Sequence, residues 1–191
     1  MGAALTRKAF WFLRHGETDW NARGLSQGNV DIPLNSVGIA QAARAARALE
    51  GKEIATVVSS PLSRARDTAE TVAAVLGRPV LVHEALREVS FGVQEGQEMS
   101  DWFNSWVEDG FTPEGGESFA ALRERTVGAI NFCLEQPGPV LVVAHGALWR
   151  AFRAEAGLPA NVRTPNALPM WVTPPAPGEE SWRFEPLSLP D

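Results

Sequence analysis

An α/β fold with a mostly parallel sheet and helices on both of its faces is predicted by this sequence. Short apolar runs alternate along the chain with longer segments in which apolar residues recur at helical spacing. Strands that alternate with helices pair in parallel, because each helix carries the chain back to the end of the sheet where the previous strand began. The 191 residues, 45% of them hydrophobic, suffice for the core of one ordinary domain. We therefore expect a single domain over residues 1–191.

The first strand and the first long helix are separated by a polar loop. Residues 10–13 are apolar and predict a buried strand. The loop over residues 16–35 contains glycine and asparagine, and Ser36 is the expected N-cap of the helix that follows. Gly51 is expected to end this helix. The apolar face of the helix is predicted to consist of Ile39, Ala42, Ala46 and Leu49.

Two more strands are predicted on either side of the second long helix. Residues 56–59 predict a strand, and the helix after Pro61 is expected to end at Gly77. Residues 79–82 then predict a third strand. The apolar face of the helix between these strands is predicted to consist of Ala65, Ala69, Val72 and Leu76.

The pattern is less regular after the third strand and then becomes regular again. Residues 84–116, which include Trp102 and Trp106, show no sustained period. Residues 140–144 predict the clearest central strand, because all five are apolar and three are valine. Between the irregular segment and this strand, the sequence predicts a long helix from the spacing of Phe119, Leu122, Thr126, Ile130 and Leu134.

The C-terminal part is predicted to hold one helix and two strands. Residues 148–156 have a helical pattern, which Gly157 closes. Residues 168–172 and 182–185 predict two late strands, joined by a proline-rich turn over residues 174–178. This hairpin is expected to add an antiparallel edge to the sheet.

Charge and composition argue against several classes of partner. A net charge of −6 disfavours broad binding to nucleic acid or to an anionic membrane, and no apolar stretch is long enough to cross a bilayer. The one cysteine, Cys133, lies in a predicted helix, so we expect a packed thiol and no disulfide within the chain. Lys8 interrupts the N-terminal apolar residues, which argues against a signal peptide. We expect a cytoplasmic protein; a homodimer is compatible with the sequence, although no feature demands one.

Two copies of a His-Gly pair indicate where the chemistry lies. Arg14-His15-Gly16 follows the first strand, and His145-Gly146 follows the central strand. Parallel neighbouring strands end at the same edge of a sheet, and open α/β sheets bind their ligands there. Two imidazoles and a guanidinium at that edge predict an anion site that contains a nucleophile.

The chain offers partners for a histidine that attacks phosphorus. Such a reaction needs fixed positive groups for the phosphoryl oxygens and a positioned acid for the leaving alkoxide. Arg64 follows the second strand near a helix start, where anions are favoured, and Asn21 is a polar donor in the loop after the first strand. Glu88 lies beyond the third strand and is the candidate acid, with Glu84 and Glu95 as nearby alternatives.

Five motifs, in order along the chain, resemble the histidine phosphatase superfamily, which includes the phosphoglycerate mutase-like proteins. The resemblance covers nearly the whole chain. One motif alone is weak, but five in order are specific. The motifs are Arg14-His15-Gly16-Glu17-Thr18 with Trp20-Asn21, then Gln27-Gly28 with Asp31-Ile32-Pro33-Leu34, then Ser59 to Glu70, then Leu86-Arg87-Glu88 with Phe91-Gly92, and last Gly115-Gly116-Glu117-Ser118 with Ala144-His145-Gly146.

The resemblance implies a fold and a set of roles. The fold is a three-layer α/β/α domain with a largely parallel sheet. His15 is the phosphorylated nucleophile, and Glu88 protonates the leaving group and then activates water. No metal ion or other cofactor is implied. The phosphoryl group is held by Arg14, Asn21, Arg64, His145 and the backbone amide of Gly146.

Specificity is expected to depend on two loops, over residues 27–34 and 88–116. Gln27 and Gly28 begin the first loop. Trp102 and Trp106 stand one helical turn apart in the second, where they either pack that segment onto the sheet or form an apolar wall for the leaving group.

Three functions are weighed against one another. A metal-independent phosphatase acting on a small phosphorylated metabolite is favoured. A phosphoglycerate mutase needs the same site, and it must also shield the phosphohistidine from water and hold a second acidic group; the short region after Glu88 has few extra basic residues for this. A phosphate-binding module with little catalysis is disfavoured, because the nucleophile and both arginines are present. Sugar phosphates, phosphoglycerates, nucleotides, α-ribazole phosphate and phosphoproteins all remain compatible substrates.

Overall fold

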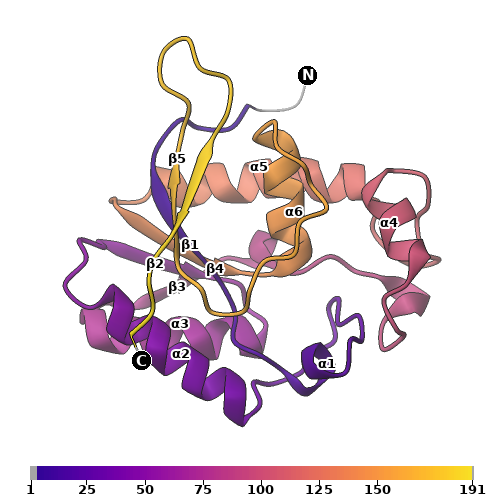
Figure 1. Cartoon of the computed structure of the whole chain (residues 1–191), viewed down its shortest axis with the longest axis horizontal. Coiled ribbons are helices and arrows are strands. Elements are labelled where there is room, and N and C mark those ends of the chain that lie inside the picture. The colour runs from indigo at the N-terminus through magenta and orange to yellow at the C-terminus, as the bar shows by residue number, and fades with distance from the viewer. Residues whose placement is uncertain (1–3, 191) are drawn as a thin grey trace.

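A twisted sheet of six strands forms the centre of the computed structural model, which describes residues 4–190 (Figure 1). The strand order is β3-β2-β4-β1-β5-β6. β1 to β4 pair in parallel, whereas β5 runs antiparallel to β1, and β6 antiparallel to β5. The strands are β1 (Phe10–Arg14), β2 (Thr56–Ser59), β3 (Val80–Val82), β4 (Val140–Ala144), β5 (Met170–Thr173) and β6 (Arg183–Pro186).

Helices cover both faces of this sheet, which confirms the predicted three-layer α/β/α fold. α2 and α3 lie against one face, and α5 and α6 lie against the other (Figure 1). Two 3-10 turns, η1 (Glu84–Leu86) and η2 (Gly92–Gln94), follow β3. The α-helices are α1 (Asp19–Ala22), α2 (Ser36–Leu49), α3 (Ser63–Leu76), α4 (Asp101–Val107), α5 (Phe119–Glu135) and α6 (Gly146–Glu155).

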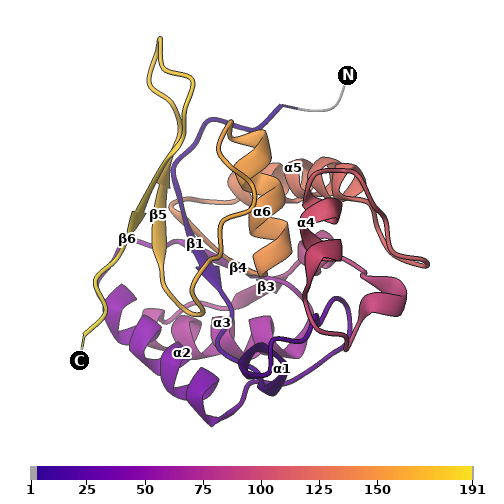
Figure 2. The ribbon, with the colours of Figure 1, turned by 45° about the vertical axis from the view of Figure 1, so that its right-hand side comes forward.

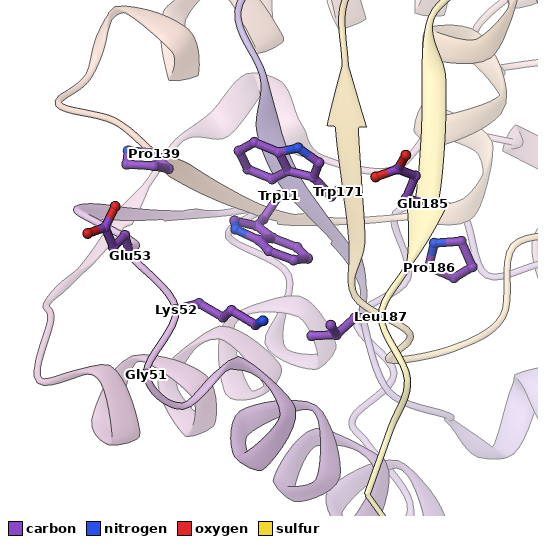
Figure 3. Close-up of a pocket in the computed structure, with 9 residues that line it drawn as sticks. All are labelled: Trp11, Gly51, Lys52, Glu53, Pro139, Trp171, Glu185, Pro186 and Leu187. Carbon is purple, nitrogen blue, oxygen red and sulfur yellow. The ribbon is translucent and has the colours of Figure 1, made fainter.

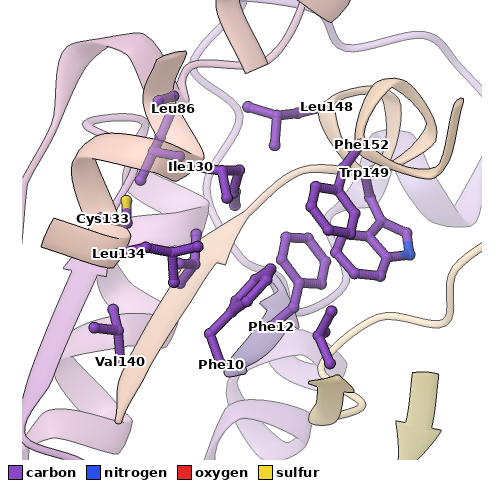
Figure 4. Close-up of a cluster of buried hydrophobic side chains, with 14 of the residues drawn as sticks. Phe10, Phe12, Leu86, Ile130, Cys133, Leu134, Val140, Leu148, Trp149 and Phe152 are labelled. Atoms are coloured by element: carbon purple, nitrogen blue, oxygen red, sulfur yellow. The ribbon is translucent and has the colours of Figure 1, made fainter. Parts of the chain in front are cut away.

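The two faces of the sheet have cores of different composition. Under α5 and α6 the core is aromatic: Phe12 stacks on Trp149 with the ring centres 3.9 Å apart, and Phe10 meets Phe152 edge-on at 5.6 Å (Figure 4). Under α2 and α3 it is built largely from alanine and valine, which lets these two helices lie close to the sheet and to each other. Together the two cores enclose β1 and β4, and residues 140–144 are fully buried, as the run of apolar residues predicted.

Several predicted boundaries shift by one or two residues. The N-cap of α2 is Asn35, not Ser36, and its side chain accepts a hydrogen bond from the Gly38 amide at 2.8 Å. Ile39 is predicted on the buried face of α2, but 61% of its surface is exposed, because it lies outside the stripe that faces the sheet. α6 begins at Gly146 rather than Leu148, so its N-terminus lies directly after the central strand.

The irregular segment after β3 packs beside the loop that follows β1. The Ser26 amide donates to the carbonyl oxygen of Gln97 at 2.9 Å, and Leu25 pairs with Glu98 in an isolated bridge. Figure 2 shows this segment and α4 on the same side of the molecule as α1. The two loops expected to decide specificity are therefore joined at the carboxyl end of the sheet.

The register of the central strands brings the two His-Gly pairs together. β1 and β4 are neighbours, Arg14 lies opposite Ala144, and the His15 amide donates to the Ala144 carbonyl oxygen at 3.1 Å. Within residues 4–190, no helix has the length and the apolar character that crossing a membrane requires.

Candidate active site

His15 is a buried imidazole whose ring is fixed by its own backbone. Nδ1 lies 2.6 Å from the carbonyl oxygen of Gly16, and since a carbonyl can only accept, Nδ1 carries the proton. In the neutral ring, Nε2 therefore keeps its lone pair. The backbone oxygen of His15 accepts a hydrogen bond from the side-chain Nδ2 of Asn166 at 2.9 Å, which holds the turn in place.

Gly16 has a structural reason to be glycine. A Cβ on this residue would lie 2.4 Å from the carbonyl oxygen of Gly38, at the first turn of α2. The backbone after β1 therefore passes directly against that turn. This close approach allows the Gly16 carbonyl to stay beside the His15 ring.

His15 and His145 are both held in the neutral form. Burial, followed by the charges of Arg64 and Arg14, lowers the pKa of His15 well below 6.5. Burial is also the main cause of the lowered pKa of His145, with Arg64 next. A neutral imidazole keeps a lone pair on one nitrogen, so Nε2 of His15 has the form that a nucleophile needs at neutral pH.

Two buried arginines supply the positive charge beside His15. Arg14 donates from Nη1 to the carbonyl oxygen of Thr164 at 2.6 Å, and Arg64 donates to the carbonyl oxygens of Val30 and Gly28 at 2.8 Å each. Burial lowers the pKa of each guanidinium to about 10, so both stay charged at neutral pH. Nε of each is buried without a protein partner.

His145 and Arg64 lie behind the pocket and do not line it. Both are fully buried, and Nε2 of His145 lies 2.7 Å from the hydroxyl oxygen of Ser60. That hydroxyl also accepts from the Leu62 amide at 3.3 Å, and it can donate its own proton to Nε2. In the tautomer in which the hydroxyl donates to Nε2, Nδ1 of His145, which is buried and has no partner, is the N–H donor that the ring can offer.

Glu88 links the pocket to the N-terminus of α6. Its Oε2 accepts from the Ala147 amide at 2.9 Å, and its Oε1 accepts from the amides of Leu148 and Val89 at 3.1 and 3.0 Å. The carboxylate is 8% exposed and lines the same pocket as His15. No intrachain partner is found for the Gly146 amide within residues 4–190, so this amide remains available beside the carboxylate.

The other carboxylates considered for the acid have different contacts. Glu84 is exposed and pairs with Arg87 at 2.9 Å. Oε1 of Glu95 accepts from the amides of Asn29 and Phe91 at 3.0 and 3.1 Å, which joins the two loops. Neither residue lines the pocket. Of the three carboxylates, Glu88 alone combines a place in the pocket with nearby positive charge.

Asn21 and the loop after it form one wall of the pocket. The side-chain oxygen of Asn21 accepts a hydrogen bond from the Thr18 amide at 3.2 Å. The NH2 group of Asn21 therefore remains available to donate to a ligand. Gln27 accepts from the Thr18 hydroxyl at 2.5 Å. Gly28 has a φ of +53°, and a Cβ there would lie 2.2 Å from Glu95 Oε1, so the turn requires glycine.

The pocket collects most of the residues that the sequence singled out. Arg14, His15, Asn21, Gln27, Gly28, Glu88 and Gly146 all line a cavity of about 50 Å³. Trp102 and Trp106 do not line it: Trp106 is fully buried and donates from Nε1 to the carbonyl oxygen of Glu117 at 2.9 Å, while Trp102 donates to that of Glu98 at 3.1 Å. The apolar wall is formed by their neighbours instead, Phe91 and Phe103, together with Leu25 and Met99.

Two arginines that line the site were not predicted from the sequence. Arg150 lines the inner cavity and, with Arg163, an adjoining outer cavity of about 270 Å³. Arg150 lies on α6, one turn after Gly146, so its position could have been found by counting four residues along the predicted helix. Arg163 lies in the loop before β5, and no sequence signal places it here.

A second, larger cavity lies at the opposite end of the sheet. It has a volume of about 650 Å³ and lies between Trp11, Trp171 and the loop that follows α2 (Figure 3). Its charged lining residues are Lys52, Glu53 and Glu185. Its lining residues include no histidine and no arginine, in contrast to those of the pocket at the carboxyl end of the strands.

Positive charge in the active-site pocket comes from arginine side chains and helix N-termini. Within residues 4–190, no group of three or more histidine, cysteine, aspartate or glutamate side chains is arranged to hold a metal ion. Burial lowers the pKa values of Arg14, Arg64 and Arg150, and the negative charge of Glu88 raises all three and partly offsets that effect. The site is therefore a mixed cluster of one carboxylate and several cations.

Comparison with known proteins shows to which family this sequence is similar. The family model of the histidine phosphatase superfamily (branch 1) matches residues 10–169. Two curated relatives, both called probable phosphoglycerate mutase GpmB, are similar to most of the chain. The one from Proteus mirabilis is 37% identical over 164 residues, covering 78% of this chain and 75% of that protein. The one from Escherichia fergusonii is 38% identical over 163 residues, with the same coverage.

Solved structures share the fold over nearly the full length. A mycobacterial glucosyl-3-phosphoglycerate phosphatase in complex with VO3 has a TM-score of 0.80 and 31% identity, covering 93% of this chain and 97% of that one. A protein from Thermus thermophilus has a TM-score of 0.77 and 32% identity, covering 96% of this chain and 100% of that one. The order and spacing of the five motifs therefore predicted the right family.

Proposed function

Because this chain belongs to the histidine phosphatase superfamily, we propose that it hydrolyses phosphomonoesters through a phosphohistidine on His15. The observation that carries the proposal is the hydrogen bond from His15 Nδ1 to the Gly16 carbonyl oxygen, which leaves a neutral Nε2 as the nucleophile. Its place in one pocket with Arg14 and Glu88 supplies the charges that phosphoryl transfer needs.

The first half of the reaction transfers the phosphoryl group to the enzyme. Nε2 of His15 attacks phosphorus in line with the ester oxygen, so that a P–N bond forms while the P–O bond breaks. Arg14, Arg64 and the free amide of Gly146 offset the charge on the non-bridging oxygens. Glu88, in its protonated form, gives its proton to the departing oxygen.

The second half returns the enzyme to its starting state. The carboxylate of Glu88 takes a proton from water, and the water oxygen attacks phosphorus while the P–N bond breaks. Inorganic phosphate leaves, and the Glu88 carboxyl is protonated again for the next turnover. The amides of Ala147 and Leu148 hold the carboxyl group at the N-terminus of α6, and from this position it acts first on the departing ester oxygen and then on the attacking water.

His145 is proposed to support the phosphoryl group from behind. The Ser60 hydroxyl bound to Nε2 orients the ring so that Nδ1–H is the free donor. The low pKa of this ring keeps it neutral, so it adds a hydrogen bond without adding a full charge. Removal of the ring therefore weakens binding of the transferred group rather than removing the nucleophile.

Trapping of the covalent intermediate tests this function. The enzyme is mixed with a ³²P-labelled phosphomonoester in the presence of EDTA and quenched in alkali after a few milliseconds. We expect label on the protein that survives alkali and is released by acid, and no label on the His15→Ala variant. Hydrolysis without such an intermediate, or hydrolysis that EDTA abolishes, contradicts the proposal.

A phosphoglycerate mutase is the second candidate, and the names of the curated relatives favour it. A mutase uses the same phosphohistidine but returns the phosphoryl group to another hydroxyl of the substrate instead of to water. Incubation with 3-phosphoglycerate separates the two: release of inorganic phosphate indicates the phosphatase, and formation of 2-phosphoglycerate without release indicates the mutase.

We also propose that the enzyme works in the cytoplasm as a metabolic enzyme. Its cysteine, Cys133, is a buried thiol whose pKa burial raises to about 12, so it is neither a nucleophile nor a disulfide partner at neutral pH. A reducing compartment is compatible with such a chain.

A further inference from the structure

Arg150 is a largely buried cation without a carboxylate partner. Its Nη1 donates to the Gly146 carbonyl oxygen only at 3.4 Å, its Nε is buried with no partner, and its guanidinium lies 5.0 Å from the centre of the Phe103 ring. No ion pair of Arg150 is found within residues 4–190. Because a buried guanidinium is costly unless its donors are satisfied, this arrangement indicates a partner that the protein itself does not provide.

Arg125, on α5, shows what a structural arginine looks like in the same protein. Its Nη2 and Nε bind both oxygens of Glu117 at 2.7 and 2.9 Å, and its Nη1 donates to the carbonyl oxygens of Ala85 and Arg87 at 2.8 Å each. Every nitrogen of that side chain has a partner. Arg150, by contrast, has neither a carboxylate nor a short hydrogen bond.

Arg163 brings a further unpaired positive charge to the same place. It lies on the exposed rim of the outer cavity, which it shares with Arg14 and Arg150, and no ion pair is found for it within the described part of the chain. Its charge lowers the pKa of both other arginines, as expected for guanidinium groups in close proximity. The outer cavity has no acidic lining residue.

The positive charge around the outer cavity contrasts with the negative net charge of the whole protein. The chain has a net charge of −6, yet three of its arginines gather around one cavity of about 270 Å³. Like charges in a partly buried cluster repel one another, and an anion between them removes that cost. Guanidinium groups bind carboxylate and phosphate oxygens with two parallel hydrogen bonds, so either anion fits.

The outer cavity lies on the leaving-group side of the site. It shares Arg14, Asn21, Leu25, Met99 and Arg150 with the inner cavity but lacks His15 and Glu88. A phosphorus atom attacked by His15 therefore lies in the inner cavity, and the rest of the ester extends outward. Leu25 and Met99 offer apolar contact to a short carbon skeleton between the two anions.

We propose that Arg150 and Arg163 bind a second anionic group of the substrate, so that the enzyme prefers phosphomonoesters whose leaving group is itself an acid. The second anion is a carboxylate or a second phosphate. This inference rests on the proposed phosphatase activity and names the class of substrate for that site. Esters of uncharged alcohols, such as simple sugar phosphates, lack the group that these arginines recognise.

Matched pairs of esters test the inference. 3-Phosphoglycerate and glycerol 3-phosphate share a three-carbon skeleton and differ in the carboxylate; fructose 1,6-bisphosphate and fructose 6-phosphate differ in the second phosphate. We measure kcat/KM for all four with the wild type and with Arg150→Gln, Arg163→Gln and Arg150→Lys. Arg87→Gln is the matched control, because Arg87 is partly exposed and pairs with Glu84 outside the pocket.

The substitutions are expected to change the ratio of kcat/KM between the two esters of a pair, and not only the rate for each ester. The wild type is expected to prefer the more acidic member of at least one pair by about tenfold or more. Arg150→Gln and Arg163→Gln are expected to reduce that ratio at least about fivefold, mainly through KM, and Arg150→Lys to restore part of it. The pair that shows the preference identifies the anion as carboxylate or phosphate.

Three outcomes decide against the inference or separate it from the proposed function. Equal losses on both members of a pair assign Arg150 to the transferred phosphoryl group or to folding, and no loss on either member makes both arginines merely structural. If the wild type hydrolyses none of the esters, the proposed phosphatase activity fails. Calorimetric binding of 3-phosphoglycerate and glycerol 3-phosphate to the same variants then still tests the second anion site.

Discussion

The two ends of the parallel strands carry opposite chemistry. At the carboxyl end, two small cavities of about 50 and 270 Å³ collect the imidazole of His15, the carboxylate of Glu88 and several arginines. At the amino end, a cavity of about 650 Å³ is lined by Trp11 and Trp171, with charges of both signs around them. The lining of the larger cavity contains no imidazole, so volume alone does not locate the candidate site.

Backbone direction explains this difference. α3 and α6 begin directly after β2 and β4, so their N-terminal amides point toward the carboxyl end. α2 and α5 end just before β2 and β4, so their C-terminal carbonyls face the amino end. Helix N-termini favour anions and C-termini disfavour them. A phosphate ester is therefore stabilised at one end of the sheet and repelled at the other, before any side chain is considered.

The largest expected effect is the loss of the nucleophile. His15→Ala is expected to lower kcat/KM for phosphomonoesters on the order of 10⁴-fold or more, because it removes the proposed nucleophile from the inner cavity. His83→Ala is the control, since His83 stacks on Phe132 away from the pocket. Steady-state phosphate release measures both; equal losses would place the chemistry elsewhere.

Loss of the acid is expected to have the next largest effect. Glu88→Gln removes the proton donor and should lower kcat roughly 10² to 10³-fold for alkyl phosphates, and less for 4-nitrophenyl phosphate, whose leaving group needs no proton. A fold defect would lower both rates alike, so the ratio between the two substrates is the decisive measurement. Glu84→Gln, at an exposed carboxylate of the same segment, should leave that ratio unchanged.

A smaller effect is expected on stability as the pH falls. The pKa of His15 and that of His145 lie well below 6.5 in the folded protein, so between that lowered value and 6.5 the unfolded chain binds more protons. Stability is therefore highest above pH 6.5 and is lost as the pH falls below it, by at most about 1.4 kcal/mol per pH unit for each histidine.

Urea unfolding at pH 7.5 and 5.5 measures this loss. We expect the wild type to lose more free energy of unfolding between the two pH values than His15→Gln, which lacks one of the two buried imidazoles. His83→Gln should behave nearly as the wild type does, because the pKa of His83 is lowered less. An equal loss in wild type and His15→Gln would show that this imidazole is not held neutral by folding.

The smallest expected effect on activity comes from the amino end. Trp171→Ala removes an indole whose centre lies 5.0 Å from that of Trp11, and should cost about 1 to 3 kcal/mol of stability. Because the large cavity contains no group of the reaction, kcat/KM below the unfolding temperature should stay within about twofold of the wild type. A drop comparable to that of Glu88→Gln would contradict the separation of the two ends.

Much of the site could be predicted because its residues follow strands. His15, His145 and Arg64 each come within a few residues of a predicted parallel strand, and the carboxyl ends of such strands must meet. For the apolar wall the sequence left two alternatives open, since Trp102 and Trp106 could either pack their segment or face the pocket. In the structure neither tryptophan lines the pocket, and the wall consists of Phe91 and Phe103 beside them. Which side of α4 faces the pocket depends on how that helix packs, and its short apolar pattern does not encode it.

By itself the sequence determined the alternation of strands and helices, the buried central strands and the motifs that predict the family. These follow from local periodicity and from the order of residues along the chain, which need no knowledge of distant contacts. Only the tertiary structure decided that Arg150 and Arg163 share a cavity with Arg14, and that Glu88 caps α6. Those contacts join segments far apart in sequence, and their geometry is set by the packing of helices and loops on the sheet, which no local pattern records.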